Sequence, residues 1–133
     1  MTRFFLAAMT ALALPMGAMA EAYDCETKHF GSGGWVPERI ILAYDTEAKV
    51  GSAFDSMINH LHKAPIPVDW SARSDTSFTF KWKLRGLKAT NGGKGINSYR
   101  VTLFTSLNKF TLSGQRHGYD NVISASGTCK KIK

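Results

Sequence analysis

Two histidines in the segment NHLH, His60 and His62, have the spacing that first suggests metal chemistry. Alternate residues of an extended chain point to the same side, so both imidazoles could reach one ion. A protein zinc site uses three or four protein ligands, and the spacing supplies no third candidate. His29 and His117 stand alone in the sequence. The sequence therefore predicts no resident metal and no other cofactor.

Serine, histidine and aspartate all occur, but no motif brings a nucleophile close to a base. The chain lacks a GxSxG sequence, which would place a serine on a sharp turn above a sheet. The segment NGGKG at residues 91–95 fits neither GxxxxGK[ST] nor GxGxxG, so we expect a hairpin connection there. These observations favour a protein without catalytic activity.

Positive charge is concentrated in the second half of the chain. Residues 21–75 hold nine acidic and five basic residues, a net charge of −4. Residues 76–133 hold one acidic and eleven basic residues, a net charge of +10. Eight of these bases form a run: Lys81, Lys83, Arg85, Lys88, Lys94, Arg100, Lys109 and Arg116. Such a run is a candidate surface for an anionic partner, and the alternative is a solvated sheet face.

The segment that must position these bases is FTFKWKLRGLK at residues 78–88. In a β-strand its alternation turns Phe80 and Trp82 to one side and Lys81 and Lys83 to the other. We expect the aromatic side to build the core and the basic side to face outward. The same alternation in INSYRVTLF turns Arg100 outward. A hairpin between the two strands then gathers one patch, with its last two bases on the strands' connecting loop. Its members are Lys81, Lys83, Arg85 and Arg100 on the strands and Lys88 and Lys94 on the loop.

The chemistry of the anionic partner depends on the compartment. Basic residues interleaved with aromatics usually indicate nucleic acid, but export excludes that partner here, and the aromatics are needed for the core. The remaining candidates are lipid head groups, lipopolysaccharide, acidic glycans or an acidic protein face.

Export is predicted by the N-terminal segment MTRFFLAAMTALALPMGAMA. One positive charge precedes an apolar run, and Ala18 and Ala20 are the small residues that signal peptidase requires. A membrane anchor is the rival interpretation, but the 17 residues from Phe4 to Ala20 are short for a span and include a proline. We therefore expect residues 1–20 to be a signal peptide. Residues 21–133 then form one periplasmic or secreted domain without a transmembrane segment.

The two cysteines, Cys25 and Cys129, lie near opposite ends of the predicted domain. In an oxidising compartment two thiols are most simply paired as one disulfide. The bond would join the first strand to the last and make them close neighbours.

Period-two patterning dominates the rest of the chain and predicts an all-β fold. Turn residues separate eight short strands, which indicates a single antiparallel β-barrel or sandwich. The segment Ser56–His62 is either a helical turn or a crossover loop. The expected strands are Tyr23–His29, Ile40–Tyr44, Val50–Phe54, Val68–Ala72, Ser77–Leu84, Asn97–Thr105, Phe110–Ser113 and Val122–Lys130.

Trp35 follows the glycine-rich segment GSGG and precedes Pro37 by two residues. It is expected either to cap one end of the core or to stand at the mouth of a pocket.

The opening YDCE, Tyr23–Glu26, resembles the first strand of small periplasmic inhibitors of C-type lysozyme, which are exported antiparallel barrels. That family carries a Ser-Gly-x-x-Tyr segment and a later Trp-x-Lys-Gly segment. Here Ser113 and Gly114 lack the following tyrosine, and Gly86 is displaced from Trp82 and Lys83. No inhibitory residue is therefore carried over, and a basic face would repel a basic lysozyme.

The sequence thus favours an exported, non-catalytic binding protein of the bacterial envelope whose basic sheet face meets an anionic partner. Two alternatives stay open: a periplasmic hydrolase inhibitor of the lysozyme-inhibitor type, and a small ligand carrier or enzyme with an internal pocket. The sequence leaves the oligomeric state open.

Overall fold

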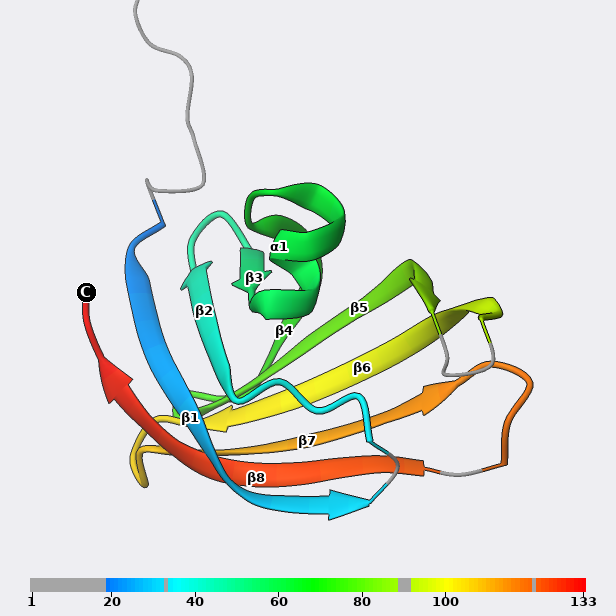
Figure 1. The fold of residues 1–133 in the computed structure, drawn as a ribbon. Coiled ribbons are helices and arrows are strands. Elements are labelled where there is room, and N and C mark those ends of the chain that lie inside the picture. Colours follow the sequence, from blue (N-terminus) through cyan, green and yellow to red (C-terminus); the bar gives the residue numbers. More distant parts are fainter. Residues whose placement is uncertain (1–18, 33, 89–91, 121) are drawn as a thin grey trace, which may run out of the picture.

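The chain forms a closed antiparallel barrel of eight strands in sequential order (Figure 1). The computed structural model describes residues 19–32, 34–88, 92–120 and 122–133. Every strand pairs with its neighbours along the chain, and the last strand pairs with the first. The all-β prediction is confirmed, and the choice between barrel and sandwich is settled in favour of the barrel. Residues 1–18 are not described, so the signal peptide stays a prediction.

All eight expected strands are present, several of them longer than the sequence pattern indicated. They are β1 (Glu21–Ser32), β2 (Arg39–Asp45), β3 (Val50–Phe54), β4 (Ile66–Ser74), β5 (Ser77–Lys88), β6 (Lys94–Phe104), β7 (Lys109–Arg116) and β8 (Val122–Lys131).

The segment that the sequence left open between helical turn and crossover loop is a helix, α1 (Ser56–His62). The side chain of Asp55 begins it by accepting a hydrogen bond from the Ile58 amide at 2.8 Å. Lys63, in the left-handed conformation, ends it. Among the described residues, no helix is long and apolar enough to cross a membrane.

The barrel interior is filled by the residues that alternate inward along the strands. On β5 the predicted aromatic side is buried, with Phe80 and Leu84 at 0% exposure and Trp82 at 6%. Tyr99 on β6 stacks on Trp82, with ring centroids 5.7 Å apart. Tyr44, Trp70 and Phe78 form a second aromatic group toward the other end of these strands. The predicted orientation of β5 is therefore confirmed.

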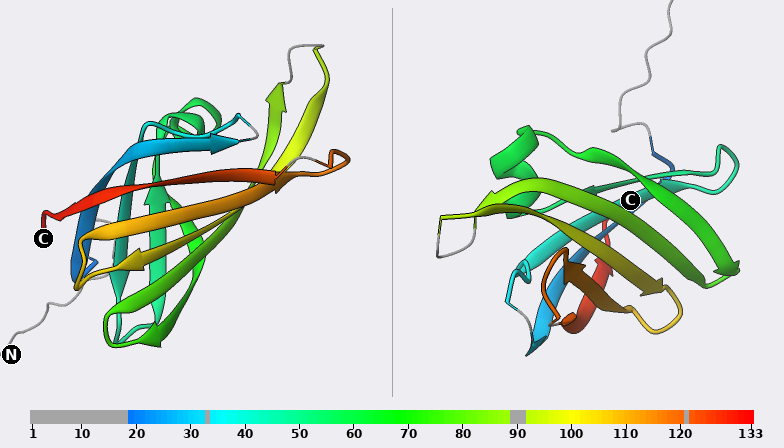
Figure 2. Two further views of the ribbon diagram at one scale, coloured as in Figure 1. Left: turned by 90° about the horizontal axis from the view of Figure 1, so that it is seen from below. Right: turned by 90° about the vertical axis from the view of Figure 1, so that its right-hand side faces the viewer.

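The β5–β6 hairpin extends past the rest of the barrel (Figure 2). Its far end depends on a bulge at Gly86, which has a φ of 89° in the left-handed region. Strict alternation after Leu84 would turn Lys88 inward. The extra residue instead buries Leu87 and leaves Lys88 exposed, directly opposite Lys94.

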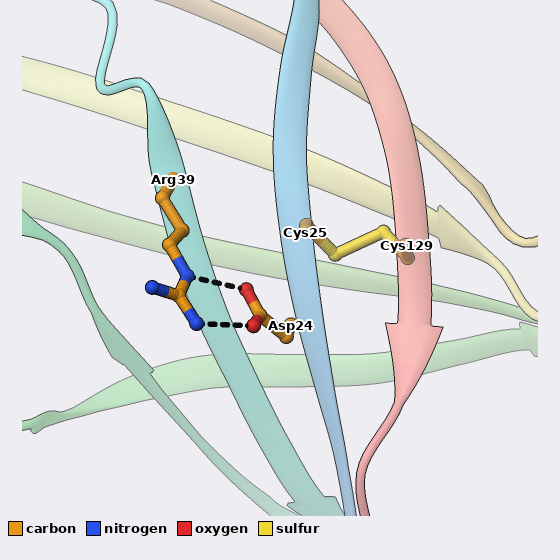
Figure 3. Close-up of a disulfide and its surroundings, with 4 residues drawn as sticks. All are labelled: Asp24, Cys25, Arg39 and Cys129. Atoms are coloured by element: carbon orange, nitrogen blue, oxygen red, sulfur yellow. Dashed lines mark hydrogen bonds and ion pairs between the residues drawn. A yellow bond between two sulfur atoms is a disulfide. The ribbon is translucent and has the colours of Figure 1, made fainter.

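The barrel closes where β1 and β8 pair (Figure 3). Cys25 and Cys129 lie opposite each other in this ladder and form the predicted disulfide across 104 residues of sequence. On the other edge of β1, Arg39 of β2 binds the carboxylate of Asp24 through two hydrogen bonds, the one from Nε being 2.7 Å long. The hydrogen bond and charge of Arg39 lower the pKa of the Asp24 carboxyl. Both neighbours of β1 are thus fixed to it by side chains.

Removing the disulfide is expected to destabilise the barrel strongly. For a closed loop of this length the chain-entropy model gives a loss of about 4–5 kcal/mol in the free energy of unfolding. Urea denaturation of the Cys25→Ala/Cys129→Ala variant measures it against the oxidised protein. Mass analysis of the wild type without reductant should show two hydrogens fewer than the dithiol form, and two free thiols would contradict the closure.

Replacing the buried indole is expected to open a large cavity in the core. Trp82→Ala should lower the free energy of unfolding by about 3–5 kcal/mol, as for other large-to-small changes of buried aromatics. The neighbouring exposed change Lys83→Ala is the control and should stay within about 0.5 kcal/mol of the wild type. A loss below about 1 kcal/mol for Trp82→Ala would show that this side of β5 does not build the core.

Candidate anion-binding groove

The six bases predicted to form one patch are all exposed on the outward side of β5 and β6. They are Lys81, Lys83, Arg85, Lys88, Lys94 and Arg100. Two like-charged pairs face each other directly across the ladder, Lys81 with Arg100 and Lys88 with Lys94. Like charges in that position are destabilising. None of the six takes part in the three ion pairs formed by the described residues.

Three of the six bases line a groove of about 930 Å³ on the outer face of β4 to β8. The β4–β5 ladder begins at Asp69 and Lys81, so Ile66–Val68 do not pair with β5 and form a separate wall. Val122 lines the groove on β8. The bases within it are Lys81, Lys83 and Arg100.

The other three bases do not line the groove. Arg85, Lys88 and Lys94 continue the row along the projecting hairpin (Figure 2). The structure therefore divides the predicted patch into a groove portion and a hairpin portion on one continuous outward side. We call these two portions together the basic row.

Uncharged polar side chains lie beside the bases of the groove. Ser113 follows Arg100 across the β6–β7 ladder, and Ser98 is opposite both Lys83 and Gln115. All of these side chains line the groove. The arrangement provides positive charge for an anion and hydrogen-bonding groups beside the charges. The outward position of Ser98 was available from the alternation that placed Arg100, but its neighbours on β5 and β7 required the strand register.

Ser98 also contacts a histidine, which the sequence gave no reason to expect. Its hydroxyl lies 2.7 Å from Nε2 of His117 in an exposed position. A nucleophile–base pair in an enzyme is oriented by a third group. In the described part of the chain no carboxylate bonds to the His117 ring. The contact joins the β6 side of the groove to the turn after β7.

Arg116 belongs to the basic run of the sequence but does not belong to the surface. It is only 4% exposed. Its guanidinium donates to Asn97 Oδ1 at 2.9 Å and to the Leu87 carbonyl at 2.8 Å, and it lies 4.5 Å from the centre of the Trp35 ring. Grouping it with the exposed bases was therefore wrong. The predicted strand ended at Ser113, whereas β7 continues to Arg116 with the inward alternation of Phe110 and Leu112.

Trp35 covers this end of the barrel. Its backbone has a φ of 59°, uncommon for a residue other than glycine, and its carbonyl accepts a 2.9 Å hydrogen bond from the Tyr99 hydroxyl. Burial raises the pKa of Tyr99 to about 12, so this donor keeps its proton at neutral pH. With its ring against Arg116, Trp35 acts as a cap on the core. It also lines a second groove with Asp55 and Met57.

The histidine pair lies on α1, where residues two apart point to different sides. The extended geometry that a shared ion would require is thus replaced by a helix. Among the described residues there is no group of three or more His, Cys, Asp or Glu side chains that could hold a metal ion.

The chain matches no protein-family model, no curated protein and no solved structure. The resemblance of Tyr23–Glu26 to the lysozyme inhibitors therefore stays a prediction, and the site is interpreted from its own geometry.

Removing the buried guanidinium should destabilise the barrel without affecting the outer face. Arg116→Ala leaves the buried oxygens of Asn97 and Leu87 without their donor, so we expect a loss of at least about 2 kcal/mol in the free energy of unfolding. Arg100→Ala, an exposed change of the same type, should stay within about 0.5 kcal/mol. Equal effects in urea denaturation would mean that Arg116 is not a structural residue.

Proposed function

We propose that the protein is an exported, non-catalytic binding protein of the bacterial envelope, periplasmic or secreted, and that it holds an anionic partner in the outer groove. The observation that carries the proposal is the gathering of Lys81, Lys83 and Arg100 in one groove, exposed and without ion-pair partners among the described residues. The disulfide is typical of proteins in oxidising compartments and supports the proposed location.

The energetics of the groove favour binding over a purely structural role. Exposed bases that face each other repel in the free protein, and a bound anion would relieve that repulsion. The groove residues include one carboxylate, Asp69, and no histidine. Such a set of groups suits charge recognition. Because the bases are exposed, salt at physiological concentration should weaken the binding by screening.

The proposal predicts that neutralising the groove weakens binding and leaves stability unchanged. Lys81→Gln/Lys83→Gln/Arg100→Gln should lose binding to anionic vesicles and envelope fragments at low salt. Its free energy of unfolding should stay within about 0.5 kcal/mol per substitution, as expected for exposed charges. Sedimentation with anionic and neutral vesicles, at low and physiological salt, measures the binding.

A matched variant controls for the change in net charge. Lys49→Gln/Lys109→Gln/Lys130→Gln removes three exposed charges that do not line the groove. It should bind anionic surfaces more tightly than the groove variant does. If the two variants bind equally, or if the wild type binds neutral vesicles as well as anionic ones, the groove is not the binding site.

A further inference from the structure

The groove contains one acid among its bases, and this acid restricts the kind of anion that fits. Asp69 on β4 lies directly opposite Lys81 in the ladder, and both side chains are exposed. The two form no ion pair among the described residues. An ionised carboxylate only accepts hydrogen bonds. A ligand made of charged oxygens alone would be repelled by Asp69, whereas a ligand that also carries hydroxyl groups could donate to it.

The other polar groups of the groove also suit a ligand that carries hydroxyl groups as well as charge. Two rows cross the strands side by side: Asp69, Lys81, Arg100 and Ser113 in one, and Lys83, Ser98 and Gln115 in the other. Each row combines positive charge with a hydroxyl or amide group. Hydroxyls and amides both donate and accept hydrogen bonds, so the rows match a ligand that carries both acidic and hydroxyl groups.

The groove and the row of bases beside it suit an extended chain. A volume of about 930 Å³ lies within the usual range for small-ligand sites, and Ile66–Val68 form a wall beside it. The basic row then runs from Lys81 to Lys88 on β5, about 23 Å at the usual rise per strand residue. An extended polymer can enter the groove and follow this row along the hairpin.

We propose that the groove binds a linear acidic glycan, a chain of sugars carrying carboxylates and hydroxyls, laid from the groove along the β5–β6 hairpin. This inference rests on the proposed function and specifies its ligand. Lys81, Lys83 and Arg100 bind the carboxylates. Asp69, with Ser98 and Ser113, binds the sugar hydroxyls, and the hairpin bases bind the continuing chain.

Two carboxylate polymers test the ligand class. Polygalacturonate carries carboxylates and hydroxyls, whereas polyacrylate carries more closely spaced carboxylates and no hydroxyls, so tighter binding of polygalacturonate would report recognition of the sugar and not of charge. Calorimetry or fluorescence anisotropy at physiological salt should show at least about tenfold tighter binding of polygalacturonate, as two or more additional hydrogen bonds would give. Galacturonate oligomers should bind more tightly as they lengthen, until they cover the basic row. The same measurements with phosphatidylglycerol vesicles and with single-stranded DNA test lipid and nucleic acid as alternative ligands.

Two variants of equal charge test the role of Asp69. Asp69→Asn keeps a hydrogen-bonding side chain, and Asp69→Ala removes it. Because both lose the same negative charge, their difference reports hydrogen bonding alone. We expect Asp69→Ala to bind polygalacturonate about 2- to 10-fold more weakly than Asp69→Asn, the range for one hydrogen bond. The Asn amide can also donate to a carboxylate, so the same comparison with polyacrylate measures the part of this difference that sugar hydroxyls do not supply. Asp75→Ala, an exposed change in the β4–β5 turn outside the groove, is the charge control.

Each outcome bears on one proposal or the other. Equal affinity for polyacrylate, vesicles or DNA, or no difference between Asp69→Ala and Asp69→Asn, would overturn the glycan assignment and leave the binding of anions intact. Failure of the wild type to bind any of these polyanions at low salt would overturn the proposed function itself.

Discussion

The ladder between β1 and β8 is the contact on which the barrel depends, because it joins the two ends of an otherwise open sheet. Cys25 and Cys129 are paired within it, 104 residues apart in sequence. Once that ladder has formed, every described strand has a neighbour on both sides, and each side chain must lie either inside or outside. The interior can then be packed with aromatic residues, while the outside of β5 and β6 remains available to the bases.

The outer face illustrates how a stable interior permits an unfavourable surface. Lys81 and Arg100 repel across the ladder, but Phe80 and Val101 beside them are fully buried and keep the strands paired. Arg116 shows the opposite arrangement, because it is buried with no acidic partner among the described residues and depends on neutral oxygens and aromatic rings. Whether a charged side chain of this protein is exposed or buried therefore depends on its position along its strand, and not only on the local composition.

Strand alternation made much of this arrangement predictable. It identified the buried side of β5, the outward bases and the faces that bring the two cysteines together. It failed at Arg116, because the predicted strand ended three residues early. Lys88 was expected only on a loop, whereas the Gly86 bulge keeps it on the outward side of β5. Asp69 could not be placed beside Lys81 from the sequence, since the register of two strands depends on packing across the whole sheet.

The closing ladder also has a consequence for the order in which the barrel can assemble. A polypeptide is synthesised from its N-terminus, so β1 is available long before β8. Until β8 arrives, one edge of β1 presents unpaired backbone groups, the kind of edge that recruits other strands. Contacts so distant in sequence also form slowly, since a long loop must close first. The two irregularities in the register of β1 with β8, near His29 and Phe30, interrupt that edge and make it a poorer template for a foreign strand.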